Sequence, residues 1–170
     1  MPGRVDFEVT GGKQLSKLAA DLAAAGGPSA RGIRLQLLRR LKVVGLTMRE
    51  AVRTNILAIP SKGEDPSGLR QAMAAASRSS VSIGRKAVRV RVQVDRKAMP
   101  AKQRTMPAAM NSETFRHPVF GTSTWVTQPG HPYFDQAVDP LLPEAQAQIY
   151  AAIDEATTAL RKGTKHVFEP

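Results

Sequence analysis

The feature that most constrains the fold is a long run of apolar residues at helical spacing in the second quarter of the chain. From residue 30 to residue 58 they recur every three or four positions, which places them on one face of a helix. They are Ile33, Leu37, Leu41, Val44, Met48, Val52 and Ile56. The pattern predicts an amphipathic helix from about Ala30 to Ala58, capped by Ser29 and roughly 40 Å long at about 1.5 Å per residue.

The opposite side of this predicted helix carries a second apolar line among positive charges. Arg31, Arg39, Lys42, Arg49 and Arg53 project from that side. Three leucines lie among them, each eleven residues from the next and therefore nearly in line on a helix, namely Leu35, Leu46 and Leu57. This line needs a partner of its own, which is either another part of the same chain or a neighbouring subunit.

A strict alternation of valines with polar residues gives the clearest strand in the chain. Val88, Val90, Val92 and Val94 alternate with Arg89, Arg91 and Gln93, which predicts valines facing the core and arginines facing outward. Residues 81–83 form the preceding strand, joined to it by a turn at Gly84 and Arg85. Residues 5–9 alternate apolar and acidic side chains and predict one more short strand.

The remaining elements are predicted from shorter patterns. A first helix has an apolar stripe of Leu15, Leu18, Ala19 and Leu22 and ends at Gly26-Gly27-Pro28. A polar linker spans residues 60–66. A short helix then begins at Ser67-Gly68-Leu69-Arg70 and runs to about Ala76. Extended segments at 115–121 and 125–129 flank a turn at 122–124. The aromatic residues gathered between Phe115 and Phe134 predict that this stretch closes the sheet onto the helices. A final helix begins near Phe134 or just after Pro143, ends at Gly163 and buries Ala145, Ile149, Ala152, Ile153, Ala156 and Leu160.

Together these elements predict an α+β fold, with a small, mainly antiparallel sheet packed against a long helix and a C-terminal helix. The length of 170 residues fits a single domain with its own core. Residues 96–114 are basic and lack either periodicity, so we expect an exposed loop that becomes ordered against a partner. Residues 164–170 form a short C-terminal tail.

Composition limits the chemistry that this chain can perform. It contains no cysteine, which excludes disulfides, thiolate zinc sites and a cysteine nucleophile. No apolar stretch reaches the roughly 18 residues of a membrane span. The net charge is +11, and residues 28–106 hold 18 of the 25 basic residues against 4 acidic ones. This imbalance suits phosphate contact, an acidic partner or a solvated face.

No catalytic, cofactor or metal site is predicted. His117, His131 and His166 are isolated from one another and from carboxylates at ligand spacing. Acidic residues near a predicted helix start, namely Asp135, Asp139 and Glu144, are explained by the helix dipole. Ser77-Arg78-Ser79-Ser80 is typical of a cap and turn. Gly11-Gly12-Lys13 lacks the spacing of a phosphate loop. We therefore expect a protein that is not an enzyme.

Several short motifs follow one another in a definite order along the chain. They are Ser67-Gly68-Leu69-Arg70-Gln71-Ala72 after the long helix, the valine strand, Phe120-Gly121, and Gln128-Pro129 with Pro132-Tyr133-Phe134 and Ala137 before the last helix. Over about residues 30–160 the chain resembles the tail-completion or neck proteins of long-tailed bacteriophages. It departs from that family at Val119, where an acidic residue is common, and in the length of segment 96–114.

The resemblance implies a structural protein of the virion, made in the host cytoplasm and assembled at the head-to-tail junction. It implies a ring, expected to be a hexamer, that completes the tail tube and joins it to the connector or stopper proteins, with genomic DNA passing through its channel. On this hypothesis the interface residues are Leu35, Leu46, Leu57, Arg89, Arg91, Lys97, Lys102, Arg104 and Trp125.

The alternative is a nucleic-acid-binding protein without sequence preference, suggested by the charge of residues 28–106. Such a protein binds duplex DNA with an affinity that falls steeply as salt rises. A ring subunit instead binds itself or a tail protein.

Overall fold

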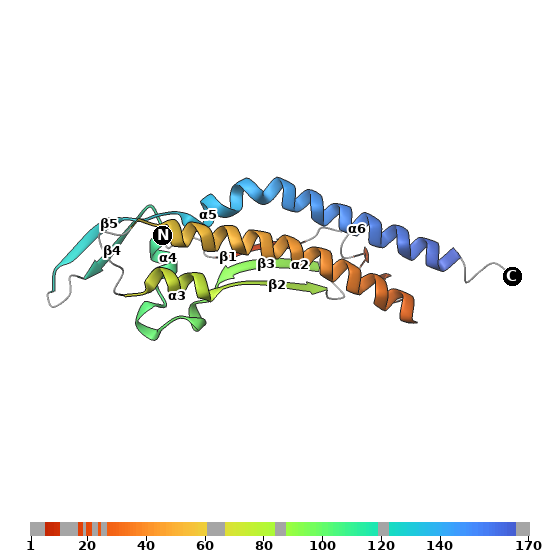
Figure 1. The fold of residues 1–170 in the computed structure, drawn as a ribbon, viewed down its shortest axis with the longest axis horizontal. Helices are drawn as coiled ribbons and strands as arrows, with labels where there is room; N and C mark the ends of the chain where they lie inside the picture. The colour runs from red at the N-terminus through yellow and green to blue at the C-terminus, as the bar shows by residue number, and fades with distance from the viewer. Residues whose placement is uncertain are drawn as a thin grey trace. The chain divides into compact units, whose positions relative to one another are not determined.

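The structure is a computed structural model that describes residues 6–10, 17–18, 20–21, 24, 27–60, 67–83, 88–118 and 123–165. Its longer elements are β1 (Asp6–Thr10), α2 (Gly27–Ala58), α3 (Leu69–Ala76), β2 (Ser77–Ile83), β3 (Val88–Val94), α4 (Met106–Met110), β4 (Thr114–Pro118), β5 (Trp125–Pro129), α5 (Tyr133–Val138) and α6 (Leu142–Lys165) (Figure 1). Residues 17–18, 20–21 and 24 are also helical, where the sequence predicts the first helix.

The strands form two separate sheets. One has three strands in the order β1-β3-β2, and the other pairs β4 with β5. The β4–β5 pair is antiparallel, with a register that runs from Thr114 opposite Pro129 to Pro118 opposite Trp125. The predicted α+β fold, with small antiparallel sheets, a long helix and a C-terminal helix, is confirmed. Strands β4 and β5 pair with each other and not with the three-stranded sheet. That the aromatic stretch from Phe115 to Phe134 closes the sheet onto the helices stays a prediction.

The long helix α2 buries the predicted stripe. Six of the seven predicted residues are buried, namely Leu37, Leu41, Val44, Met48, Val52 and Ile56, and Ile33 is half-buried. The predicted cap at Ser29 is wrong, because the helix already begins at Gly27. Pro28 is compatible with that start, since the first backbone N–H groups of a helix have no partner within the helix and proline lacks this group.

The chain divides into two compact units, each assembled from three separated segments. The first consists of residues 1–7, 48–78 and 92–141, and the second of residues 8–47, 79–91 and 142–170. The expectation of a single domain remains a prediction. Each unit has its own buried residues and is described separately below.

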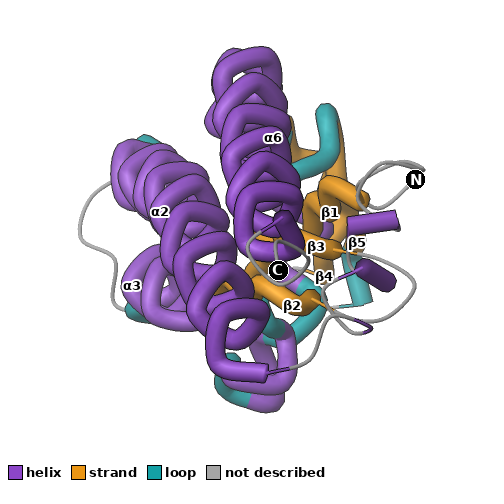
Figure 2. Tube along the Cα trace, turned by 90° about the vertical axis from the view of Figure 1, so that its right-hand side faces the viewer, coloured by secondary structure: helices purple, strands orange, loops and turns teal. Residues whose placement is uncertain are grey.

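The second unit is built on residues 27–47 of α2 and on α6, which lie side by side, with strand residues next to them (Figure 2). Its buried residues include Leu41, Val88 and Val90 from α2 and β3, together with five residues of the predicted α6 stripe, Ala145, Ile149, Ala152, Ile153 and Ala156. Gly45 lets α2 approach the strands closely. A Cβ atom there would lie 3.3 Å from the Ser79 Cβ atom and 3.4 Å from the Val90 Cγ1 atom.

The first unit is centred on Tyr133 and Phe134 of α5, which are 1% and 0% exposed. Met73 of α3 and the valines Val92 and Val94 of β3 are buried in the same unit. Helix α3 begins after Gly68, which has a φ of 58°, a conformation that glycine adopts without steric cost.

The alternation in β3 correctly predicts which of its side chains are buried. All four valines of this strand, Val88, Val90, Val92 and Val94, are buried.

The prediction of an exposed loop over 96–114 is wrong in part. This segment contains two short 3-10 helices, Arg96–Ala98 and Ala101–Gln103, followed by α4. Met99, Pro107, Ala108 and Asn111 are buried, whereas the basic side chains are exposed. The buried apolar residues here are Met99 and, eight residues later, the adjacent pair Pro107 and Ala108. This spacing has neither a helical nor a strand period, which explains why the sequence pattern indicates a loop.

Both predicted starts of the last helix correspond to real elements. A short helix, α5, begins at Tyr133, and α6 begins at Leu142 after a 3-10 turn at Asp139–Leu141. The predicted end at Gly163 is wrong, since α6 continues to Lys165. Helix boundaries shift easily by one or two residues, and a glycine in the last turn costs little packing.

Several predicted features lie outside the described residues. They are Leu15, Ala19 and Leu22 of the first helix, Gly11-Gly12-Lys13, Gly26, the linker residues 61–66, the turn at Gly84-Arg85, the motif residues Val119, Phe120 and Gly121, and residues 166–170 of the C-terminal tail.

Gly130 joins β5 to the segment that leads into α5, and its position requires the absence of a side chain. Its backbone N–H donates to the Glu113 carbonyl oxygen at 2.7 Å, and the next N–H, of His131, donates to the Met110 carbonyl oxygen at 2.6 Å. A Cβ atom on Gly130 would overlap the backbone carbonyl group of Ser112. Because a backbone group cannot move aside as a flexible side chain does, only glycine fits here without displacing the chain.

We expect Gly130→Ala to lower the free energy of unfolding by about 1–3 kcal/mol, the usual cost of forced overpacking. Gly32→Ala is the matched control, because Gly32 lies in α2 and a Cβ atom added there would meet no other atom within 4 Å; this change should raise stability by about 0.5–1 kcal/mol. Urea unfolding of both variants, followed by circular dichroism, measures the difference. Equal stability of the two variants would contradict the close approach at Gly130.

Candidate functional site

The residues that could support metal binding or catalysis do not converge. Among the described residues, no group of three or more His, Cys, Asp or Glu side chains could hold a metal ion. The His117 ring lies 5.9 Å from the Phe115 ring, centroid to centroid, and His117 is half-buried on β4. His166 lies outside the described residues.

The carboxylates near the helix starts have structural roles or simple surface positions. Asp135 lies in the first turn of α5, and Glu144 lies in the first turn of α6, as predicted. Asn111 is 3% exposed. Its Oδ1 atom accepts the Phe134 backbone N–H at 2.7 Å, and its Nδ2 group donates to the Asp135 carboxylate at 2.8 Å. Both polar atoms of the buried Asn111 amide therefore have hydrogen-bond partners at the start of α5, as buried polar groups generally do.

The serine cluster after α3 supplies the predicted cap, but the predicted turn is wrong, because Ser77-Arg78-Ser79-Ser80 are the first residues of β2. Ser77 is 2% exposed, and its hydroxyl donates to the Met73 carbonyl oxygen at 3.1 Å. The Arg78 guanidinium donates to the Ala75 carbonyl oxygen at 2.5 Å. These bonds satisfy carbonyl groups at the end of a helix.

Tyr133 is the titratable residue whose environment changes its acidity most clearly. Burial, followed by the negative charge of Asp135, raises the pKa of the Tyr133 hydroxyl above its ordinary value. The neutral hydroxyl donates to the Pro107 carbonyl oxygen at 3.2 Å. Tyr133 thus acts as a buried hydrogen-bond donor between α5 and α4.

The predicted apolar line on α2 is exposed. Leu35, Leu46 and Leu57 are 49%, 46% and 50% exposed, and Val43, which sequence reasoning did not single out, is 61% exposed. These residues lie on the helix side opposite the buried stripe, because they are offset from it by about half a turn. Val43 could have been found from its spacing of three to Leu46.

The other predicted interface residues belong to different elements. Arg89 is exposed on β3, whereas Arg91 is half-buried, which modifies the expectation that both arginines face outward. Lys97, Lys102 and Arg104 are exposed in segment 96–104. Of the nine predicted residues, Leu35, Leu46, Arg89 and Arg91 belong to the second unit, and Leu57, Lys97, Lys102, Arg104 and Trp125 belong to the first.

Trp125 is 56% exposed at the start of β5. The Arg116 guanidinium carbon lies 6.0 Å from its ring centroid, at the limit of a cation–π contact. Apart from the half-buried Val126, the described side chains of β5 are exposed. The hairpin therefore presents an aromatic side chain and a positive charge rather than a closed pocket.

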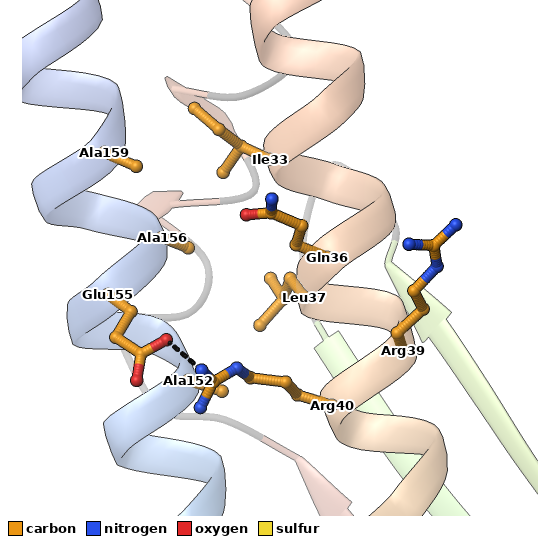
Figure 3. Close-up of a pocket in the computed structure, with 9 residues that line it drawn as sticks. All are labelled: Ile33, Gln36, Leu37, Arg39, Arg40, Ala152, Glu155, Ala156 and Ala159. Atoms are coloured by element: carbon orange, nitrogen blue, oxygen red, sulfur yellow. Dashed lines mark ion pairs between the residues drawn. The ribbon is translucent and has the colours of Figure 1, made fainter.

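A groove that the sequence pattern did not predict lies in the second unit between α2 and α6 (Figure 3). It has a volume of about 490 Å³, and its lining residues are Ile33, Gln36, Leu37, Arg39, Arg40, Ala152, Glu155, Ala156 and Ala159. The Arg40 guanidinium and the Glu155 carboxylate, both more than half exposed, pair across it at 2.8 Å. The sequence feature that could have predicted this groove is the set of alanines spaced three and four residues apart on α6, because small side chains on one helix face leave room between helices.

A smaller groove of about 340 Å³ lies in the same unit, lined by Lys17, Leu18, Asp21, Ile153, Asp154, Thr157, Leu160 and Arg161. Neither groove brings together a nucleophile, a base and an oxyanion site of the kind that acyl or phosphoryl transfer requires. Both are surface depressions between helices.

In the part of the chain that the structure describes, no helix is both long and apolar enough to cross a membrane. Comparisons with protein-family models, with curated proteins and with solved structures found no match.

The raised pKa of Tyr133 gives a pH-dependent prediction. A raised pKa means that the folded state favours the neutral hydroxyl, so this stabilisation is complete below the ordinary pKa of 10.0 and is lost as pH rises above it. In urea unfolding the native protein should be more stable than Tyr133→Phe by about 1 kcal/mol, the contribution of the hydrogen bond. This difference in the free energy of unfolding should shrink between about pH 9 and pH 11.

The matched control for this measurement is Tyr150→Phe, which removes a hydroxyl from a side chain that is 52% exposed. The difference in stability between this variant and the native protein should stay nearly constant over the same pH range. A constant difference for Tyr133→Phe as well would show that burial does not affect the ionisation of Tyr133.

Proposed function

We propose that this protein is a structural subunit of a bacteriophage virion that forms a ring at the head-to-tail junction and joins the tail tube to the connector. The observation that carries the proposal is the exposed apolar line on α2. Leu35, Val43, Leu46 and Leu57 are each between 46% and 61% exposed, on a helix whose opposite face is already buried.

An apolar line of this kind favours assembly over catalysis. Single exposed leucines are ordinary on protein surfaces, but here four large apolar side chains lie along one helix face among charged residues, and two of them, Val43 and Leu46, are one turn apart. Fully burying one leucine or valine side chain contributes about 1.5–3 kcal/mol, so covering the exposed halves of such a line contributes several kcal/mol to binding. A partner protein can provide that cover.

The order of elements also supports the proposal. The tail-completion family that the sequence resembles has a long helix, a following strand and a final helix, and here α2, β3 and α6 occur in that order. The exposed Trp125 hairpin and the basic side chains of Lys97, Lys102 and Arg104 are available to contact the tube, the stopper or a neighbouring subunit. A ring, which we expect to be a hexamer, needs no pocket, since its contacts are surfaces.

A second candidate function is nucleic-acid binding without sequence preference. It is favoured by one observation, the exposed basic side chains Arg31, Arg34, Arg39, Arg40 and Lys42 on α2. Phosphate groups bind such a surface through charge alone. In the proposed ring these charges either line the DNA channel or contact acidic protein surfaces.

The decisive experiment for the ring function is to tag the protein in cells that produce the whole phage particle and to locate it in purified particles. We expect co-purification with tail-tube and connector proteins and a label at the upper end of the tail. Leu46→Glu should reduce incorporation into particles at least about tenfold, since a charge on the apolar line costs more than 1.4 kcal/mol of binding. Recovery of nucleic acid alone, without virion proteins, would refute the proposal.

Gln36→Glu is the matched control for Leu46→Glu. It adds the same charge to an exposed position of α2 that lines the groove rather than the apolar line. Incorporation of this variant should stay close to that of the native protein. Equal losses for both variants would mean that any added charge on α2 prevents assembly and that the apolar line has no special role.

The two candidate functions also differ in their dependence on salt. For a ring subunit we expect weak binding of a DNA duplex at 50 mM salt, measured by fluorescence anisotropy, and almost none at 200 mM. A dedicated DNA-binding protein that makes 6–10 phosphate contacts keeps measurable affinity at low salt and loses about 10³–10⁵-fold over this range. Tight binding with that steep slope would favour the second candidate.

A further inference from the structure

A short segment of the first unit, residues 95–104, gathers positive charge on the surface. Its four basic side chains, Arg96, Lys97, Lys102 and Arg104, are all exposed. They lie in two short 3-10 helices and at the residue that ends the second of them. Asp95 is the one acidic residue of this sequence, so residues 95–104 form a basic segment with an excess of positive charge.

The basic segment is attached at both ends of α3. The Asp95 backbone N–H donates to the carbonyl oxygen of Ala76, the last residue of α3, at 2.9 Å. The Gln103 side-chain amide donates to the Ser67 carbonyl oxygen, just before α3, at 3.0 Å. Between these two points Met99 is 3% exposed. Because the backbone is already held in place, a ligand that binds these charges does not have to order the segment.

Carboxylates near the basic segment do not cancel its charge. The Asp95 side chain caps the first 3-10 helix by accepting a backbone N–H. Glu64 and Asp65 lie a few residues before α3 in the sequence and are outside the described residues. Even when residues 60–70 are counted together with the basic segment, six basic side chains stand against three acidic ones. The surroundings therefore stay positive.

The exposed residues between these cations are small. Ala98, Pro100 and Ala101 are exposed, whereas Met99, the one large apolar residue of the segment, is buried. The basic segment thus lacks the apolar centre that is typical of an interface between proteins, where lysine is also depleted. Interfaces with nucleic acid phosphates are instead polar and strongly positive. The basic side chains of α2 differ, because they lie among exposed leucines.

We propose that the basic segment binds the phosphate backbone of duplex DNA without reading its sequence. The segment contains no aromatic side chain that could stack on unpaired bases, which favours a duplex over a single strand. The inference rests on the proposed function for the place of this contact: in the ring, the segment would face the genome that passes through the channel. Each subunit would supply about four phosphate contacts, which is too few for tight binding by one copy.

The test is duplex binding by the isolated full chain, measured by fluorescence anisotropy of labelled DNA of arbitrary sequence. With about four phosphate contacts, the affinity of the native protein should fall about 100-fold between about 50 and 200 mM salt. In a chain with Lys97→Gln and Lys102→Gln, the slope of log affinity against log salt should become about half as steep. The affinity of this variant at about 50 mM salt should be at least about tenfold lower.

Two further variants are the controls. Lys97→Arg with Lys102→Arg keeps both charges and should bind like the native protein, which separates the effect of charge from a change of structure. Arg39→Gln with Lys42→Gln removes the same charge from exposed positions of α2. Because salt screens charges beyond about one Debye length, this variant should keep the native affinity within about twofold. Circular dichroism checks that each variant remains folded.

Three outcomes would overturn the inference. They are no duplex binding by the native protein at low salt, a larger loss of affinity for the α2 variant than for the Lys97→Gln and Lys102→Gln variant, and normal duplex binding by the latter together with failure to enter particles. The second outcome assigns the DNA to α2, and the third assigns the basic segment to an acidic protein.

The proposed function is tested separately, because the salt dependence is measured without particles. A chain that is located at the neck, but whose duplex binding does not depend on Lys97 and Lys102, refutes only this inference. A chain that is absent from particles, but whose duplex binding depends on both lysines, refutes only the proposed function.

Discussion

The burial of one apolar stripe along α2 is the constraint on which the rest of the structure depends. Leu37, Leu41 and Val44 are buried in the second unit, and Met48, Val52 and Ile56 are buried in the first. One helix therefore supplies core residues to both units. A helix of this length with a single buried stripe leaves its other side free, and that side carries the leucines and arginines on which the proposed function rests.

The elements with a strong period could be predicted from the sequence, whereas those without one could not. The seven-residue alternation of β3 and the stripe of α2 each repeat often enough to fix which side chains are buried. Segment 96–114 has no repeat, because its buried residues are isolated anchors such as Met99 and Asn111. The pairing of β4 with β5 alone depends on tertiary contacts, and local composition cannot show which sheet a short strand joins.

The candidate surfaces were predictable to a similar degree. Leu35, Leu46 and Leu57 lie off the buried stripe, so their exposure follows from helical geometry. The half-buried position of Arg91 does not follow from alternation, because alternation assumes that one face of the sheet is open to water. The groove beside Arg40 depends on where α6 lies against α2, which is a property of packing rather than of either helix alone.

The same helix pair shows why charge and apolar area must be considered together. The exposed Arg40–Glu155 pair contributes at most about 1 kcal/mol, because water screens both groups. Charged groups on an exposed helix face therefore select partners and orientations more than they add affinity. In the ring that we propose, the exposed apolar side chains Leu35, Val43 and Leu46 would supply most of the binding energy. Every subunit of a closed ring would make two such contacts, so contacts that are weak between single copies would be sufficient for assembly on a particle.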